Sequence, residues 1–164
     1  MPPPFFGGHD LTVRQVGAEK GVIMGEVLTA RELGAMSRAA VARKDKEGWL
    51  EIFAPDAVVQ DPIGPSPFNP DGEGHKGREA IGKFYDEVIS SSEKITFDIQ
   101  SSTLCANECA DVGIIKTWLA GGTHVAIVHC VFTYKATDDN HLASLRAYWE
   151  FDKTQLVEAS EVED

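Results

Sequence analysis

The order of two hydrophobic periodicities along the chain constrains its fold more than any other feature. Residues 29–53 and 77–89 place apolar side chains at helical spacing, whereas residues 95–151 contain several runs in which apolar and polar side chains alternate. Helical spacing gathers residues three and four apart on one face, and alternation puts every second residue of a strand on one face. Helices followed by a series of strands predict an α+β domain rather than a doubly wound parallel sheet.

The helical stretches carry boundary signals of their own. Thr29 and Glu32 have the spacing of a capping box ahead of an apolar series. Asp45 is placed to cap a second short helix, which we expect to end at Pro55. A third helix is expected over residues 77–89.

The strand signals begin in the middle of the chain. Residues 57–61 predict a short strand that Pro62 stops, and a loop rich in proline and glycine follows over residues 64–74. Later strands are expected near residues 95–99, 110–119, 124–134 and 142–151. A long antiparallel sheet curls, so the sequence predicts a cone-shaped, curved mixed or antiparallel sheet wrapped by about three helices. The mouth of such a cone is suited to an apolar ligand.

The chain is expected to contain one folded domain. Residues 1–28 are rich in proline and glycine at their start and predict a poorly ordered arm or leader, with a short strand or helix around residues 11–27 as the alternative. Residues 29–155 form the predicted domain, and residues 156–164 form an acidic tail.

Composition narrows the class of function. The 164 residues are 43% hydrophobic and 25% charged, as in ordinary globular proteins. The net charge of −11 argues against nucleic-acid and membrane-surface partners, and no apolar run approaches the length of a membrane helix. Three cysteines without metal-ligand spacing (Cys105, Cys109 and Cys130) predict free thiols in the cytoplasm, with no metal and no cofactor.

Asp61 is the most informative polar residue. It ends an apolar strand and shares a face with Ala57 and Val59. If that face lines a pocket, burial raises the pKa of the carboxyl group, which suits a general base. The alternative is a turn aspartate that caps the loop at Pro62.

Three segments resemble the steroid delta-isomerase (ketosteroid isomerase) family of the nuclear-transport-factor-like, SnoaL-like superfamily. They are VQDPIG at 59–64, GREAI with FY between 77 and 85, and RAYW at 146–149, within a likeness that covers residues 33–153 in the same order. The resemblance implies a cone-shaped domain, a homodimer and a steroid-like hydrophobic ligand. It also implies that Asp61 is a catalytic base, which moves a proton so that a double bond becomes conjugated with a ketone.

The resemblance assigns further residues as well. Tyr85 matches a supporting tyrosine, which makes it the second catalytic candidate. The two positions that hold the charged oxygen of the intermediate in this family fall on Ser37 and Cys130, and both replacements are weaker donors. Substrate-binding positions fall on Ser37, Val41, Phe53, Phe84, Val128, Cys130, Phe132 and Trp149.

Loss of one good oxyanion donor typically costs about 2.7–4 kcal/mol, so we expect isomerisation to be weak or altered.

Three alternatives stay open from the sequence. The chain could be a non-catalytic binding protein for steroid- or polyketide-like molecules, another enzyme such as an epoxide hydrolase or cyclase, or a subunit-association domain without a ligand.

Overall fold

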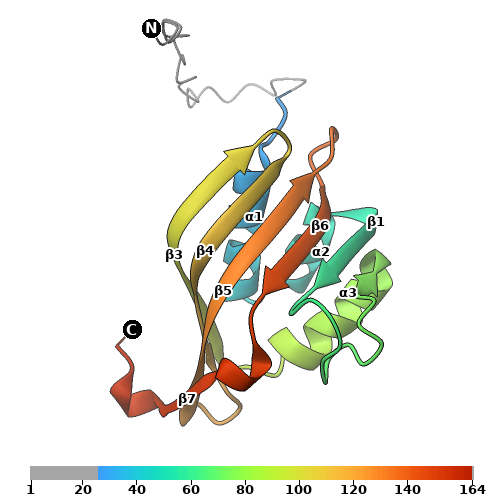
Figure 1. The fold of residues 1–164 in the computed structure, drawn as a ribbon. Helices are drawn as coiled ribbons and strands as arrows, with labels where there is room; N and C mark the ends of the chain where they lie inside the picture. Colours follow the sequence, from blue (N-terminus) through green and yellow to red (C-terminus); the bar gives the residue numbers. More distant parts are fainter. Residues whose placement is uncertain (1–25, 164) are drawn as a thin grey trace, which may run out of the picture.

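The computed structural model describes residues 26–163, so all but the end of the predicted arm at residues 1–28 lies outside it. Two α-helices precede the first strand and a third follows it, as Figure 1 shows. The bounds are α1 (Ala30–Ala42), α2 (Lys46–Ile52), β1 (Phe53–Gln60), β2 (His75–Lys76), α3 (Gly77–Phe84), β3 (Lys94–Cys105), β4 (Glu108–Trp118), β5 (His124–Ala136), β6 (Leu142–Tyr148) and β7 (Gln155–Glu158).

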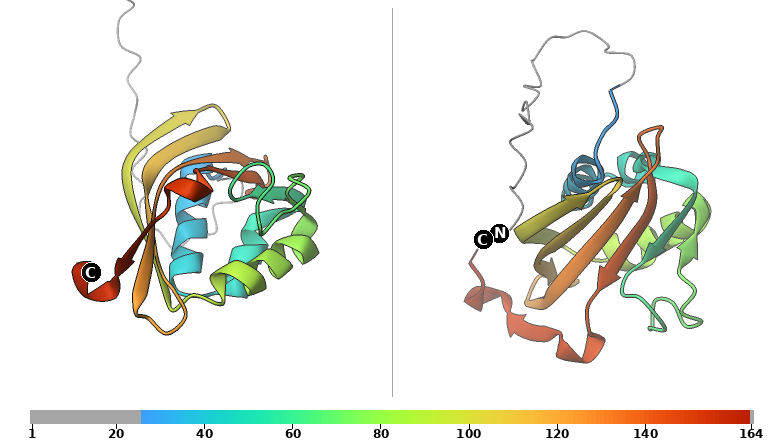
Figure 2. Two further views of the ribbon diagram at one scale, coloured as in Figure 1. Left: turned by 60° about the horizontal axis from the view of Figure 1, so that its bottom comes forward. Right: turned by 45° about the horizontal axis from the view of Figure 1, so that its top comes forward.

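The strands form one 7-stranded sheet in the order β2-β1-β6-β5-β4-β3, and β7 pairs with β5. The β1–β6 pair is parallel and the other pairs are antiparallel. The sheet is strongly curved and the helices lie on its concave side (Figures 1 and 2). Helix α1 packs on β3, β4 and β5, and α3 packs on β1. The predicted α+β cone is therefore confirmed.

Both predicted N-terminal caps are present. The Thr29 side chain accepts a hydrogen bond from the Glu32 amide while the Glu32 carboxylate accepts one from the Thr29 amide, which completes the capping box of α1. Asp45 caps α2 through the Gly48 amide at 2.9 Å. The predicted end of α2 at Pro55 was wrong, because the helix stops at Ile52 and β1 begins at the next residue.

The third helix changes character at its C-terminal end. The helix predicted over residues 77–89 is α-helical to Phe84 and continues as a π-helical turn over Tyr85–Ile89. The Lys44 ammonium group donates to the carbonyl oxygens of Ile89 and Ser92, and so satisfies acceptors that the end of the helix leaves free.

The strands agree with the predicted alternation, except that β6 ends at Tyr148 rather than at residue 151 and that β2 was not predicted. Strands β4 and β5 form the predicted hairpin, and its turn contains Gly121 and Gly122 at φ +88° and +69°, where side chains are disfavoured. Strand β7 was not predicted. It pairs with the first residues of β5, between Gln155–Glu158 and His124–Ile127.

Candidate active site

A cavity of about 370 Å³ lies between the sheet and the helices. Its wall is formed by side chains from all three α-helices, from strands β1, β3, β4, β5 and β6, and from the segments that follow β1 and β6. Most of these side chains are aliphatic or aromatic. The volume falls in the range of small-molecule sites, and an apolar wall with a few polar groups is typical of them.

Asp61 reaches this cavity because it continues the buried face of β1. Ala57 and Val59 are fully buried on that face, and both Val59 and Asp61 line the cavity. The amide of Ile63 donates to the Ala147 carbonyl at 3.0 Å, which holds the chain after Asp61 against β6. The side chain is thus fixed by a strand on one side and a backbone hydrogen bond on the other.

The carboxylate of Asp61 has one hydrogen-bond partner among the described residues. The indole N–H of Trp149 donates to its Oδ1 at 2.6 Å. Burial raises the pKa of the Asp61 carboxyl group, and the Trp149 hydrogen bond opposes this effect by favouring the charged form. The residue keeps partial exposure because it faces the open cavity. A carboxylate whose pKa is raised by burial is more basic than one in water, which suits a general base.

Three aromatic side chains from irregular segments form one end of the cavity, which we call the aromatic rim: Phe68, Trp149 and Phe151. The rings of Trp149 and Phe151 stack with centroids 5.8 Å apart, and Phe68 meets Phe151 edge-on at 6.1 Å. Phe151 is 51% exposed, so the rim is the outer end. The inner end carries side chains that are almost fully buried, including Ser37 and Val59.

Most of the residues assigned from the sequence line this cavity. Besides Asp61 they are Ser37, Val41, Phe84, Val128, Phe132 and Trp149. The Ser37 hydroxyl oxygen accepts a hydrogen bond from the indole N–H of Trp49 at 2.9 Å, so one side of this short side chain is already engaged. Its role as a ligand donor stays a prediction.

Three assigned residues do not form the cavity wall. Phe53 is fully buried and packs edge-on against Trp49 with ring centroids 4.9 Å apart. Burial raises the pKa of Tyr85, and the charges that act on it belong to Asp45, Asp86 and Lys46 rather than to Asp61.

The third of these residues, Cys130, is buried on the same face of β5 as Val128 and Phe132. Burial raises the pKa of its thiol, and the charge of the nearby Asp61 raises it further. Cys130 is therefore close to the carboxylate and remains a neutral thiol.

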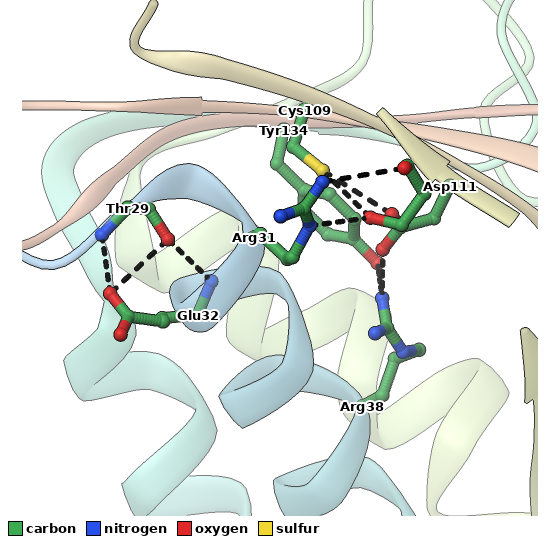
Figure 3. Close-up of polar contacts among 8 residues, drawn as sticks. Thr29, Arg31, Glu32, Arg38, Cys109, Asp111 and Tyr134 are labelled. Atoms are coloured by element: carbon green, nitrogen blue, oxygen red, sulfur yellow. Dashed lines mark hydrogen bonds and ion pairs between the residues drawn. The ribbon is translucent and has the colours of Figure 1, made fainter. Parts of the chain in front are cut away.

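The polar residues of the wall that the sequence analysis missed include Arg38 and Tyr134. The Arg38 Nη1 donates to the Asp111 carboxylate at 2.6 Å and to the Tyr134 hydroxyl oxygen at 3.1 Å (Figure 3). Strand alternation could have found Tyr134, because it is two residues from Phe132 and therefore on the same face. Arg38 gave no such signal, since an arginine beside an apolar helix face usually extends into solvent.

Within residues 26–163, no cluster of three histidine, cysteine or acidic side chains has a geometry that could hold a metal ion.

None of the described helices combines the length and the hydropathy needed to span a membrane.

The chain is similar in sequence and in fold to proteins of known structure. The family model described as SnoaL-like domain matches residues 35–158. A search of the curated proteins finds no match. The structure of Rv0760c from Mycobacterium tuberculosis is 32% identical with a TM-score of 0.74, and the match covers 80% of this chain and 100% of that chain.

Two further solved structures have steroids in their descriptions. A Delta 5-3-ketosteroid isomerase from Mycobacterium sp. is 33% identical with a TM-score of 0.73, and the match covers 78% of this chain and 98% of that chain. The complex of Rv0760c with estradiol-17β-hemisuccinate is 34% identical with a TM-score of 0.71, and the match covers 77% of this chain and 97% of that chain.

Proposed function

The chain belongs to the SnoaL-like domain family, in its ketosteroid isomerase-like group, and on that premise we propose that it binds a steroid-like ketone and shifts a double bond by proton transfer through Asp61. The observation that carries the proposal is the Asp61 carboxylate, which lines an apolar cavity and has Trp149 as its hydrogen-bond partner. The similar solved proteins include a ketosteroid isomerase and a complex with a steroid derivative, which supports the ligand class.

In the proposed reaction the carboxylate of Asp61 removes a proton from the carbon between the ketone and the double bond of a β,γ-unsaturated ketone. The electron pair of that C–H bond moves into a dienolate, whose negative charge rests largely on the ketone oxygen. The protonated carboxyl group then returns the proton two carbons further along, which gives the conjugated ketone and restores the carboxylate. No proton or electron is gained or lost over the cycle.

Binding in the cavity would supply the apolar environment that this proton transfer uses. A carboxylate with few hydrogen bonds is more basic than one in water, and Asp61 has this environment before the ligand arrives. The aromatic rim would cover the outer part of the ligand and exclude water from the carboxylate.

A second candidate function is binding without turnover. It is favoured by the two positions where the family has its oxyanion donors, because Ser37 already accepts a hydrogen bond from Trp49 and Cys130 is buried and is not among the residues of the cavity wall. A thiol is also a weak donor. A chain with this cavity and without a working oxyanion donor would hold the ligand and leave it unchanged.

We further propose that the outer face of the sheet joins two copies of the chain and that the protein acts in the cytoplasm, as the sequence predicts. Tyr148 and Val112 are 45% and 40% exposed and are among the large hydrophobic side chains that contact solvent. Light scattering coupled to gel filtration should give the mass of a dimer, and a monomer mass would reject this part of the proposal.

The test compares the wild type with Asp61→Asn on a β,γ-unsaturated 3-ketosteroid, and follows the absorbance of the conjugated enone. We expect kcat/KM to fall by about 10²–10⁴-fold because the base is lost, while the Kd for the conjugated product changes only a few-fold. Asp56→Asn is the matched control, since Asp56 is an exposed aspartate of the same strand.

The outcomes separate the candidates. Turnover that requires Asp61 supports the isomerase. Saturable binding without turnover in the wild type supports the binding protein. Turnover that survives in Asp61→Asn rejects the assignment of the base, and the absence of steroid binding rejects both functions.

A further inference from the structure

The inner part of the cavity wall contains two polar side chains that take no part in the proposed proton transfer. Arg38 of α1 and Tyr134 of β5 both line the cavity, and Tyr134 is only 1% exposed. The two side chains meet at the Tyr134 hydroxyl, which accepts a hydrogen bond of 3.1 Å from Arg38. Asp111 is fully buried, and its carboxylate accepts a hydrogen bond of 2.6 Å from the same Arg38 nitrogen, Nη1.

The fold brings the Tyr134 ring unusually close to helix α1. A Cβ atom built on Gly34 would lie 2.8 Å from two carbons of the Tyr134 ring, a distance that real side chains do not adopt. Glycine at this position therefore lets the ring lie flat against the helix, and the hydroxyl reaches Arg38 one turn further along α1. The Phe132 ring stacks with the Tyr134 ring, with centroids 6.2 Å apart. The phenol is thus held in one orientation.

The hydroxyl proton of Tyr134 has no hydrogen-bond acceptor among the described residues. A tyrosine hydroxyl can accept and can donate one hydrogen bond. Its oxygen accepts from Arg38, but none of the described side chains or backbone groups accepts its proton. The nearby Asp111 carboxylate instead accepts from Arg38 and from the Cys109 thiol (Figure 3). Buried donors in native proteins are rarely left without an acceptor, so this proton is available to a ligand in the cavity.

The charge of Arg38 beside the Tyr134 hydroxyl favours a hydrogen bond from this hydroxyl to an electron-rich oxygen of the ligand. Burial raises the pKa of Tyr134, and Arg38 opposes this effect, so the phenol stays protonated and remains a donor. A donor whose own oxygen accepts from a guanidinium group is polarised, and it forms a stronger hydrogen bond. The preferred acceptor is therefore a ketone oxygen that gains negative charge or a phenolic oxygen.

We infer that Tyr134, polarised by Arg38, forms a second polar subsite that donates a hydrogen bond to a ketone or phenolic oxygen of the ligand. The inference rests on the proposed function, and it names the part of the ligand that Asp61 does not contact. It also identifies a donor that could act in place of the family donors at Ser37 and Cys130.

The two subsites are positioned by different strands of the sheet. In the sheet, Val59 pairs with Leu145 and Leu145 pairs with Tyr134, so Tyr134 is two strands across from Val59. Asp61 is two residues beyond Val59. With about 4.8 Å between strands and about 3.3 Å per residue, the Cα atoms of Asp61 and Tyr134 are roughly 12 Å apart. Asp61 and Tyr134 can therefore contact different atoms of one ligand.

The test is a binding experiment that does not depend on turnover. Dissociation constants are measured by calorimetry for estradiol, for its analogue without the 3-hydroxyl group and for its analogue without the 17-hydroxyl group. We expect Tyr134→Phe to weaken estradiol binding about tenfold, the loss typical of one hydrogen bond to a polarised partner. We expect the same substitution to have little effect on the analogue without the 3-hydroxyl group, because it lacks the phenolic oxygen.

The matched control is Tyr148→Phe. The Tyr148 hydroxyl also accepts a hydrogen bond from an arginine, Arg146, but it is exposed and is not part of the cavity wall. This substitution should leave all three constants unchanged. If Tyr134→Phe does not fold, Arg38→Lys provides the comparison, since it keeps a cation for Asp111 and weakens the polarisation of the phenol.

An equal loss for all three ligands, no loss for any, or insensitivity only of the analogue without the 17-hydroxyl group would overturn the subsite and leave the proposed function intact. A wild type that binds none of the ligands would overturn the proposed function, and the subsite with it.

Discussion

The carboxyl group of Asp61 combines an apolar environment with a single hydrogen bond from Trp149. Such a group is easier to protonate in the folded chain than in the unfolded chain. The apolar environment that makes Asp61 basic therefore also lowers the stability of the folded chain when the carboxyl group is ionised. Active sites commonly lose stability in this way for the sake of activity.

The first prediction concerns stability as a function of pH. Because the folded-state pKa of Asp61 is raised, the folded state holds more protons than the unfolded state between the two pKa values. The free energy of unfolding therefore falls as pH rises through that window, and the loss is complete above the folded-state pKa. We expect Asp61→Asn to have a Tm a few degrees above that of the wild type at neutral pH. Below the ordinary aspartate pKa of about 3.9 the difference should vanish. A Tm difference that is constant with pH in thermal scans would contradict this explanation.

The second prediction concerns the partner of Asp61. Removing the indole N–H in Trp149→Phe deletes the contact that lowers the pKa, so the Asp61 pKa should rise further. Titration of the carboxyl carbon by NMR measures this directly, and the rising limb of any pH–activity profile should move in the same direction. Trp118→Phe, which alters a tryptophan outside the cavity wall, should leave the titration unchanged. A fall in the Asp61 pKa in Trp149→Phe would show that the indole is not its main partner.

The sequence predicted single residues best where a strand pattern and the family resemblance agreed. Asp61 was found because alternation placed it with Ala57 and Val59, and the cavity-facing positions of β5 followed the same rule. Tyr85 and Phe53 were assigned by position in the family, and sequence alone cannot show that both rings pack around Trp49 outside the cavity. Arg38 was missed because its partners, Asp111 and Tyr134, are 73 and 96 residues away.

At the scale of elements, helix α1 is attached to the sheet by one buried ion pair. Arg38 of α1 contacts Asp111 of β4, and the side chains are 15% and 0% exposed. The third prediction is that Asp111→Asn lowers the free energy of unfolding by about 3 kcal/mol, since it leaves a buried charge without its partner. The double variant Arg38→Met with Asp111→Leu should recover most of this loss in urea unfolding. A double variant less stable than Asp111→Asn would mean that the pair itself stabilises the fold.

The fourth prediction uses two helical glycines that differ in their surroundings. In Gly34→Ala the new methyl group meets the Tyr134 ring, and we expect a loss of about 1–3 kcal/mol from overpacking. In Gly82→Ala the nearest atoms are side chains at 3.6 Å, and we expect a gain of about 0.5–1 kcal/mol from helix propensity. Chemical denaturation of both variants measures the contrast. Equal effects would show that the ring moves aside at no cost.

Helices and strands were predicted well where residues close in the sequence carry the signal. They were predicted less well where pairing with a distant strand decides whether the element forms. Thr29 and Asp45 identified two helix starts because capping is a local interaction. Strand β7 has only four residues, and it forms because β5 offers it unpaired backbone groups, which a short acidic sequence does not reveal. The π-helical turn at Tyr85–Ile89 was likewise read as the continuation of an α-helix.

At the scale of the whole molecule, the net charge of −11 surrounds a cavity that is mostly apolar. The fifth prediction is that a sulfated steroid binds more weakly than its neutral parent at low ionic strength. Raising the salt to about 0.15 M, where the screening length is about 8 Å, should reduce the difference several-fold. Equilibrium binding at two salt concentrations measures this effect. If both ligands respond equally to salt, the surface charge does not influence ligand choice.

The aromatic rim comes from segments outside the regular structure, whereas Asp61, Arg38 and Tyr134 are held by the sheet and by α1. Replacing Phe68 or Phe151 alters loop side chains and leaves the strand ladders and the capped helices untouched. The entrance can therefore be redesigned at these two positions to admit other ligands, provided that Trp149 is kept as the partner of Asp61.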